Sequence, residues 1–177
     1  MTGGNGSGKS TFLNVIAGLY CPEKGFIAVD GQSIDFQEIA NFQSLISTVF
    51  RESFLFCDDR YRAETGLSSV KVQALLEDYG LAELVNYEDG HFHYDGLSAG
   101  LSKRLALVVA LAEDKPILLL DEWAAEQDPS FRDYFYRKIL PALRAAGKTV
   151  VAITHDEQYF YLADQILELR QGELVEK

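Results

Sequence analysis

The sequence contains little cysteine, little positive charge and no long hydrophobic run. Its two cysteines, Cys21 and Cys57, form no Cys-x-x-Cys pair, so we expect reduced thiols and neither a disulfide framework nor a cysteine metal site. The 16 lysine and arginine residues are outnumbered by 27 acidic residues, and the net charge of −11 disfavours nucleic acid as a partner. The longest apolar runs, Leu105–Ala112 and Ile117–Leu120, fall short of the roughly 20 residues of a membrane-spanning helix. We therefore expect a soluble chain, without a signal segment at its start.

The opening GGNGSGKST fits the P-loop pattern, which binds phosphate groups. Closely spaced glycines let backbone N–H groups surround phosphate oxygens, and the helix that follows directs its positive dipole end at them. We expect this helix to run from about Ser10 to Ala17 and to end at Gly18. Lys9 is expected at the outer phosphates, the Ser10 hydroxyl on Mg²⁺ and Thr11 at the inner phosphate. A flexible glycine linker is the alternative, but a linker seldom carries Lys-Ser-Thr followed by an amphipathic helix. The loop itself comprises Gly3, Gly4, Asn5, Gly6, Ser7 and Gly8.

The rest of the chain alternates strand and helix patterns, which is typical of an α/β fold with a parallel sheet. A hairpin is predicted around the Asp30-Gly31 turn. Residues 57–94 carry one clear helical segment, VKVQALLEDYG, and no strong strand signal. This predicts a small helical subdomain at about residues 57–105, with His91 and His93 in a surface loop rather than at a metal site. Strands are predicted at Leu45–Val49, Pro116–Asp121, Thr149–Thr154 and Ile166–Leu169, and longer helices at Ala99–Ala112 and Phe131–Ala146.

A second candidate site lies at the end of the apolar strand ILLLDE, residues 117–122. Ligands of open α/β sheets bind at the carboxyl ends of the strands, where the two acids are expected. Asp121 would hold Mg²⁺, and Glu122 would polarise the attacking water. The alternative is that the two acids simply end a strand without a function. The presence of a P-loop earlier in the chain disfavours this alternative. Together the two motifs predict binding and hydrolysis of ATP.

The segment LSAGLSKRLALVVALAEDKPILLLDEW resembles the signature motif, helix and Walker B strand of ABC ATPases, in their usual order. The resemblance implies a P-loop NTPase fold with a RecA-like parallel sheet, and an active site completed only in a head-to-tail dimer. Ser98 and Gly100 match the signature positions that reach the nucleotide of the partner domain. Asp128 matches the D-loop aspartate at the dimer interface, and His155 matches the switch histidine at the γ-phosphate. The implied catalytic residues are Glu122, His155 and Lys9, and the implied cofactors are ATP and Mg²⁺.

Two further segments narrow the resemblance. DEWAAEQDP and GKTVVAITHDEQYFYLAD are similar to bacterial exporters of cyclic peptides and siderophores, in which ATP hydrolysis powers transport. This implies a membrane domain, fused or separate, as a partner and a location at the cytoplasmic face of the inner membrane. Phe54 and Phe56 are expected to dock on that domain. Trp123 is expected in the core and Arg132 in solvent. Residues 1–177 would be a single ATP-binding domain that lacks its first strands.

Three features depart from the family pattern. The chain begins two residues before the P-loop, so the strand expected there is absent from the sequence. Arg51 stands at the position of the Q-loop glutamine; a guanidinium cannot ligate Mg²⁺, and would pair with a phosphate or an acidic group or remain a solvated charge. Ala99 and Leu101 replace the signature Gly and Gln, and a left-handed φ at Ala99 would strain the loop. Two alternatives follow: a truncated, non-catalytic nucleotide-binding fragment and, less favoured by the charge, a soluble ABC ATPase.

Overall fold

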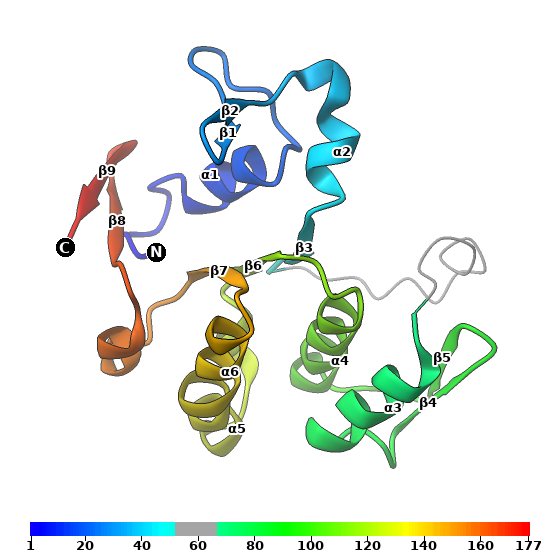
Figure 1. The fold of residues 1–177 in the computed structure, drawn as a ribbon. Helices are drawn as coiled ribbons and strands as arrows, with labels where there is room; N and C mark the ends of the chain where they lie inside the picture. The colour runs from blue at the N-terminus through cyan, green and yellow to red at the C-terminus, as the bar shows by residue number, and fades with distance from the viewer. Residues whose placement is uncertain (52–66) are drawn as a thin grey trace.

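The computed structural model describes residues 1–51 and 67–177, and its centre is a three-stranded parallel sheet (Figure 1). The strands are β3 (Ile46–Val49), β6 (Ile117–Asp121) and β7 (Thr149–Ile153), in the order β3-β6-β7. Both outer strands pair with β6 in parallel. The nearly continuous apolar run of β6 suits a strand that is covered on both faces, as parallel sheets require. The predicted α/β fold class is confirmed.

Met1 and Thr2 add to this pairing, although no strand is predicted before the P-loop. The N–H of Thr154, next to β7, donates to the carbonyl of Met1 at 3.1 Å. On the other side, the N–H and carbonyl of Thr2 bond to backbone groups of β8 (Leu167–Arg170) at 2.8 and 2.9 Å. These two residues therefore connect β7 with β8. The backbone that leads into the P-loop is fixed by hydrogen bonds to β8 and to the residue after β7.

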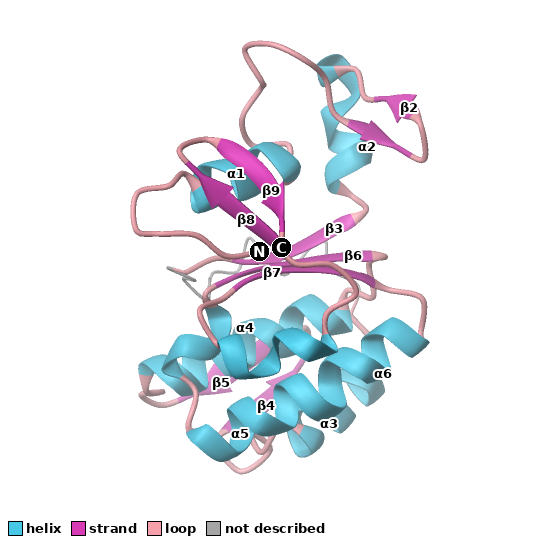
Figure 2. Cartoon of the chain, turned by 90° about the vertical axis from the view of Figure 1, so that its left-hand side faces the viewer, coloured by secondary structure: helices cyan, strands magenta, loops and turns pink. Residues whose placement is uncertain are grey.

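Helices cover both faces of the sheet (Figure 2). The P-loop helix α1 (Lys9–Ile16) lies on one face, and the long helix α4 (Ala99–Ala112) lies on the other. Beside α4 runs a continuous helical segment of three parts: α5 (Pro129–Tyr134), a π-helical stretch (Phe135–Ile139) and α6 (Leu140–Ala145). The three predicted helices are confirmed, apart from one or two residues at their ends and the π-helical geometry within the third.

Each face of the sheet has its own apolar core. Between α1 and the sheet, Leu13, Leu119 and Ile153 are all buried to within 1% of their surface. The larger core on the opposite face includes Trp123 and Phe135, whose ring centroids are 4.5 Å apart. Trp123 lies two residues after the end of β6, so its burial fixes the chain close to the point where the strand ends. The expected core position of Trp123 is confirmed.

The segment before α4 contains a helix and a β-hairpin. Helix α3 (Ser69–Asp78) confirms the predicted helical segment. Strands β4 (Val85–Glu88) and β5 (His91–Tyr94) pair antiparallel around the Asp89-Gly90 turn, where both residues have positive φ. The expectation of no strand in this segment, with both histidines in a loop, is wrong. An Asp-Gly turn between alternating apolar residues is a strong hairpin signal, so the residues carried the information.

Short elements complete the described chain. The predicted hairpin around Asp30-Gly31 is confirmed as β1 (Ala28–Val29) and β2 (Gln32–Ser33). It leads through a 3-10 turn into the short helix α2 (Ile39–Gln43). At the other end, β8 confirms the last predicted strand, and it pairs antiparallel with β9 (Glu173–Glu176), which was not predicted. Further 3-10 turns span Trp123–Glu126 and Glu157–Leu162.

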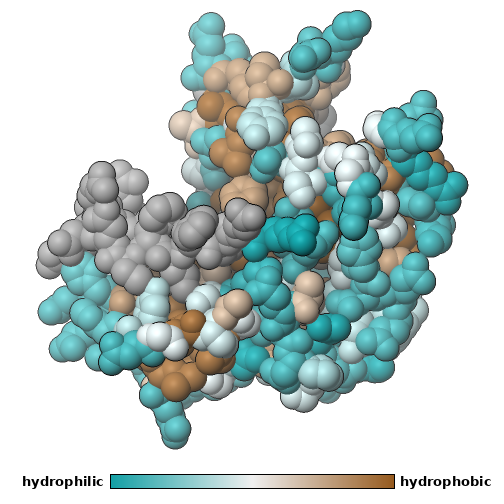
Figure 3. All heavy atoms as spheres, turned by 180° about the vertical axis from the view of Figure 1, so that it is seen from behind, coloured by the Kyte–Doolittle hydropathy of each residue, from teal (hydrophilic) through white to brown (hydrophobic). Residues whose placement is uncertain are grey.

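The surface is largely polar, with apolar residues in several places. Figure 3 shows one apolar region in the upper part of the molecule, where Figure 1 places β1, β2 and α2, and another in the lower part. The exposed Leu19, Tyr20 and Phe26 lie in the connection between α1 and β1. None of the helices in the described ranges is long and apolar enough to cross a membrane. Phe54 and Phe56, expected to dock on a membrane domain, lie outside the described residues, as does Cys57.

Candidate functional site

The glycine-rich loop runs from Gly3 to Gly8 and leads directly into α1. Gly3, Gly6 and Gly8 have φ values of 150°, 75° and 96°, in a region that favours glycine. A Cβ on Gly3 would lie 2.5 Å from the carbonyl oxygen of Leu169, so the packing against β8 also requires glycine. Gly8 precedes α1 without a side-chain cap, which leaves N–H groups of the first turn available to an anion. Asn5 is exposed at the tip of the loop.

Lys9 carries the positive charge of this loop and is buried, with 7% of its surface exposed. Its Nζ donates to the carbonyl oxygens of Gly3 and Gly4 at 2.9 and 3.0 Å. The amine therefore lies inside the turn of the loop, held by neutral acceptors that a phosphate group would outcompete. Ser10 and Thr11 are exposed in the first turn of α1, where their hydroxyls are accessible to a ligand.

The two acids at the end of β6 have different environments. Asp121 is 4% exposed, and its Oδ1 is buried without a hydrogen-bond partner among the described residues. A buried carboxylate oxygen without a partner is costly unless a cation or donor reaches it. Carboxylate and hydroxyl oxygens are ligands that Mg²⁺ accepts, so Asp121, with Ser10, fits the expected metal role.

Glu122 follows in a strained backbone conformation, with φ of 48° and ψ of 32°. Its N–H donates to the carbonyl of Ile153 at 3.1 Å, which holds the turn against β7. Left-handed conformations of residues other than glycine are uncommon and cluster at functional sites. At Glu122 the chain turns sharply at the end of β6, between the buried carboxylate of Asp121 and the buried ring of Trp123.

The carboxylate of Glu122 has two neighbours from adjacent strands. Nε2 of His155, which follows β7, lies 3.5 Å from Oε1 of Glu122, and Nη1 of Arg51, which follows β3, lies 3.5 Å from Oε2. The three side chains thus meet at the carboxyl edge of the sheet, where open α/β sheets bind their ligands. Of the possibilities left open for Arg51, pairing with an acidic group is the one observed, although the arginine side chain remains 66% exposed.

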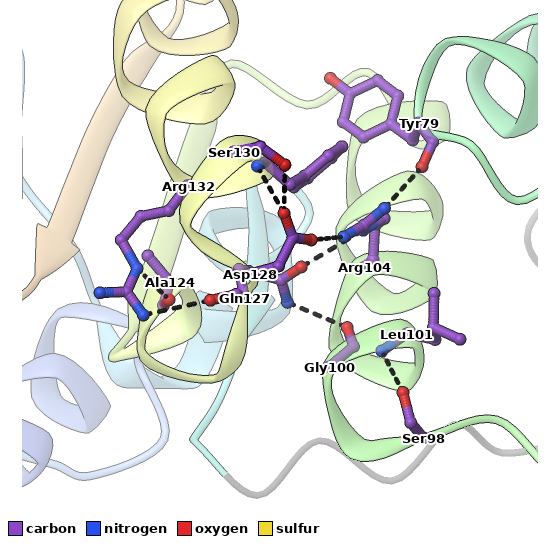
Figure 4. A network of polar contacts seen from close by, with 11 residues as sticks. Tyr79, Ser98, Gly100, Leu101, Arg104, Ala124, Gln127, Asp128, Ser130 and Arg132 are labelled. Atoms are coloured by element: carbon purple, nitrogen blue, oxygen red, sulfur yellow. Dashed lines mark hydrogen bonds and ion pairs between the residues drawn. The ribbon is translucent and has the colours of Figure 1, made fainter.

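The signature segment Leu97–Leu101 forms the start of α4. Ser98 is the N-cap, and its Oγ accepts from the N–H of Leu101 at 3.3 Å. Ala99 is the first helical residue, so its φ is not left-handed. The backbone strain that a left-handed φ would cause at this residue is therefore absent. The side chain of Leu101 packs against the large core. The segment borders a cleft of about 560 Å³ lined by Ser98, Ala99, Gly100, Leu101, Arg104, Glu126, Gln127 and Asp128 (Figure 4).

Asp128 lies on the opposite side of this cleft, as the N-cap of α5. Its carboxylate accepts from the N–H of Phe131 at 2.9 Å, from the Ser130 hydroxyl and from Arg104 at 2.9 Å. The hydrogen bond from Ser130, followed by those from Phe131 and Arg104, lowers the pKa of Asp128 to about 2. The carboxylate is therefore ionised at neutral pH and held by its own chain.

The structure separates the expected site residues into two groups. Asp121, Glu122 and His155 lie at the carboxyl edge of the sheet, whereas Ser98, Gly100 and Asp128 line the cleft at α4. None of the P-loop residues lines that cleft.

Sequence reasoning missed the polar side chains that join the segments around the cleft. Arg132, expected in solvent, instead donates to the carbonyls of Ala124, Ala125 and Gln127 at 3.1 Å each. That expectation is wrong because the acceptors belong to the turn before α5, whose path no helical periodicity reveals. Gln127 itself, buried and bonded to α4, carries no motif signal.

Comparison with known proteins places the chain among ATP-binding components of transporters. Residues 1–125 match the family described as ABC transporter. The chain is 43% identical, over 99% of its length, to the ATP-binding protein SyrD of Pseudomonas syringae pv. syringae. Among solved structures, a bacterial Atm1-family ABC exporter with ATP bound is similar with a TM-score of 0.80 and 29% identity over 98% of the chain. The ATP-binding cassette MJ0796, dimeric and bound to ADP and Pi, follows with 0.78 and 28% over 99%.

These relatives differ in how much of their length the chain matches. The chain spans 31% of SyrD and 32% of the exporter chain, but 82% of the MJ0796 chain. The similarity to most of a cassette chain and to about a third of two longer chains agrees with the resemblance drawn from the sequence motifs.

Proposed function

Since this chain belongs to the ABC transporter family and is an ATPase of that type, we propose that two copies hydrolyse ATP at shared sites and thereby power export through a membrane domain. The site residues named below, the head-to-tail arrangement and the exported substrate class are parts of this proposal. ATP binding itself follows from the family.

The P-loop holds the phosphates in this proposal. Backbone N–H groups from Gly3 to Gly8 surround the phosphate oxygens, and Lys9 leaves its two carbonyl acceptors to bind the outer phosphates. Thr11 contacts the inner phosphate. Ser10 and Asp121 would hold Mg²⁺, which neutralises phosphate charge when bound. Oδ1 of Asp121, which has no hydrogen-bond partner within the part of the chain that the structure describes, supports this assignment.

Glu122 and His155 act on the attacking water. The carboxylate of Glu122 accepts a hydrogen bond from the water and orients it towards the γ-phosphate. His155, 3.5 Å from that carboxylate and half exposed, holds Glu122 on one side and reaches the γ-phosphate on the other. The strained turn at Glu122 fixes the carboxylate at the edge of the sheet before any nucleotide arrives.

The observation that carries the shared site is the separation of the two groups of residues. Ser98, Gly100 and Asp128 line a cleft to which no P-loop residue contributes. If these residues are to contact a nucleotide, that nucleotide is the one held by the P-loop of a second copy. A head-to-tail dimer brings each cleft to the other copy's P-loop and forms two equal sites. The dimeric cassette MJ0796 supports pairing of such domains.

Export of a peptide-like substrate is the finer part of the proposal. It rests on the similarity of DEWAAEQDP and of the segment around His155 to bacterial exporters of cyclic peptides and siderophores, and on the likeness to the Atm1-family exporter. A fused or separate membrane domain would then be the partner, and the chain would lie at the cytoplasmic face of the inner membrane.

Replacing Glu122 by glutamine tests the catalytic assignment. Glu122→Gln removes the carboxylate but keeps the size and the turn, so we expect ATP turnover to fall by at least about 10²-fold while ATP still binds. Turnover is measured as phosphate release, and binding by calorimetry. The control is Glu157→Gln, the same chemical change at an exposed position two residues after His155, and it leaves both quantities unchanged. Loss of ATP binding in Glu122→Gln would refute the assigned role.

A further inference from the structure

Gln127 is a buried polar residue, 4% exposed, between the turn that follows Glu122 and helix α5. Both polar atoms of its side-chain amide form hydrogen bonds with residues of α4. Nε2 donates to the carbonyl oxygen of Gly100 at 2.9 Å, and Oε1 accepts from Nε of Arg104 at 3.2 Å (Figure 4). A buried amide with both ends bonded has one favourable orientation, so Gln127 fixes the two groups that it contacts relative to each other.

Arg104 is itself held from several sides. Nη2 pairs with Asp128 at 2.9 Å, Nη1 donates to the carbonyl of Tyr79 at 3.3 Å, and the guanidinium lies 3.6 Å above the ring of Phe131. Only 13% of its side chain is exposed. A planar guanidinium with this many partners is immobile, so the acceptor end of Gln127 is anchored to a rigid group.

Gly100 is the residue whose position this arrangement controls. A Cβ on Gly100 would lie 2.6 Å from the carbonyl oxygen of Glu126, so the signature segment packs directly on the backbone before Gln127. The carbonyl of Gly100 accepts the hydrogen bond from Gln127. A second connection runs in parallel, because Nζ of the buried Lys103 lies 2.9 Å from Oε1 of Glu126. The start of α4 and the turn after β6 are thereby joined by backbone contact, a hydrogen bond and an ion pair.

We propose that Gln127 is a positioning residue for ATP hydrolysis, which fixes the Gly100 peptide and so directs Ser98 and Gly100 at the nucleotide of the second copy. This inference rests on the proposed head-to-tail dimer. Without the bond from Gln127 the Gly100 peptide keeps the Ser98 cap on its N–H side but is held less firmly, and a smaller fraction of the molecules presents the segment in the orientation that the second copy recognises. The affinity between the two copies falls in proportion to that fraction, whereas ATP binding to the P-loop of a single copy stays the same.

The test uses the chain with Glu122→Gln, in which ATP is bound without turnover. Gln127→Leu removes both bonds of the amide, and Gln127→Glu keeps an acceptor for Arg104 but removes the donor to Gly100. The control is Gln43→Leu, since Gln43 Nε2 also donates to a glycine carbonyl, that of Gly18, at 3.0 Å and outside the cleft. ATP affinity is measured by calorimetry, and the dissociation constant of the Mg·ATP-induced dimer by analytical ultracentrifugation.

Losing one hydrogen bond lowers the ratio of correctly to incorrectly oriented segments by about fivefold, and the oriented fraction by at most that factor. Because a dimer contains two such segments, we expect both Gln127 variants to weaken dimer formation by up to roughly 25-fold, with ATP affinity unchanged and the Gln43→Leu dimer equal to the parent. The Glu variant covers the case in which the Leu variant does not fold. Dimers as tight as the parent's in Gln127→Glu would overturn the inference and leave the proposed function standing. A parent that binds ATP but forms no dimer would overturn the shared site, and this inference with it.

Discussion

Replacing Arg51 by glutamine is expected to raise ATP turnover, because the ion pair with Arg51 competes with the attacking water for the carboxylate of Glu122. The atoms Nη1 and Oε2 are 3.5 Å apart, and the side chains are 66% and 17% exposed. Solvent screens such a pair, so it contributes only about 0.2–1 kcal/mol. Breaking the pair to release Glu122 before each turnover costs this free energy. Removing Arg51 therefore raises kcat by about 1.5- to fivefold.

The assay is phosphate release at saturating Mg·ATP, at low and at high salt. Salt weakens exposed ion pairs, so turnover of the parent rises with salt while that of Arg51→Gln changes less. The control is Arg170→Gln, whose pair with Glu168 has side-chain exposures of 64% and 19%, close to those of the Arg51 pair, and which is expected to leave kcat unchanged. A kcat that falls tenfold or more in Arg51→Gln would refute the reasoning, because Arg51 would then act in turnover, as a phosphate contact does.

Two further predictions concern stability. Asp128→Asn keeps a good helix N-cap but removes a carboxylate whose pKa in the folded chain, about 2, lies below its ordinary 3.8. The ionised carboxylate therefore stabilises the fold fully above about pH 4, and this contribution is lost as the pH falls from 4 to 2. Thermal melts should show that Tm falls less steeply between pH 4 and 2 in the variant than in the parent. An equally steep fall of Tm in both chains would contradict the prediction. Tyr136→Phe removes the hydroxyl that bonds to Thr154 at 2.7 Å and to Asp156 at 3.0 Å, on either side of His155. We expect Tm to fall by roughly 2–4 °C, against no change for Tyr161→Phe, whose ring is exposed; equal melting of parent and Tyr136→Phe would contradict this prediction.

The parts of the fold that the sequence predicted are those in which local pattern and tertiary environment agree. Helix α4 is predicted to the residue because Ser98 is a good N-cap and the apolar positions that follow match a buried helix. The strand ending at Asp121 is apolar throughout and covered on both faces, so its pattern is unambiguous. The hairpin at Asp89-Gly90 was not predicted, although its turn signal was present in the sequence.

The contacts within the candidate site were beyond sequence reasoning for a different reason. That Arg51 lies beside Glu122 depends on the order of three strands, and sequence patterns give the strands but not their order. Gln127 donates to the carbonyl of Gly100, and Arg132 bonds mainly to backbone carbonyls, which carry no residue-specific signal. The left-handed φ of Glu122 is likewise imposed by the packing of its neighbours and not by its own preference.

The shared site is tested most directly by mixing two defective chains, both carrying Glu122→Gln. In the first chain, Lys9→Ala disables the P-loop. In the second chain, Ser98→Asp retains an N-cap for α4 but introduces a negative charge that repels the phosphate bound by the partner. We expect neither chain alone to form a dimer with Mg·ATP. A mixture contains one intact P-loop facing one intact signature segment, so native mass spectrometry should find a mixed dimer with one ATP. ATP-dependent pairing of the Ser98→Asp chain with itself, or no mixed dimer from two folded chains, would contradict the head-to-tail site.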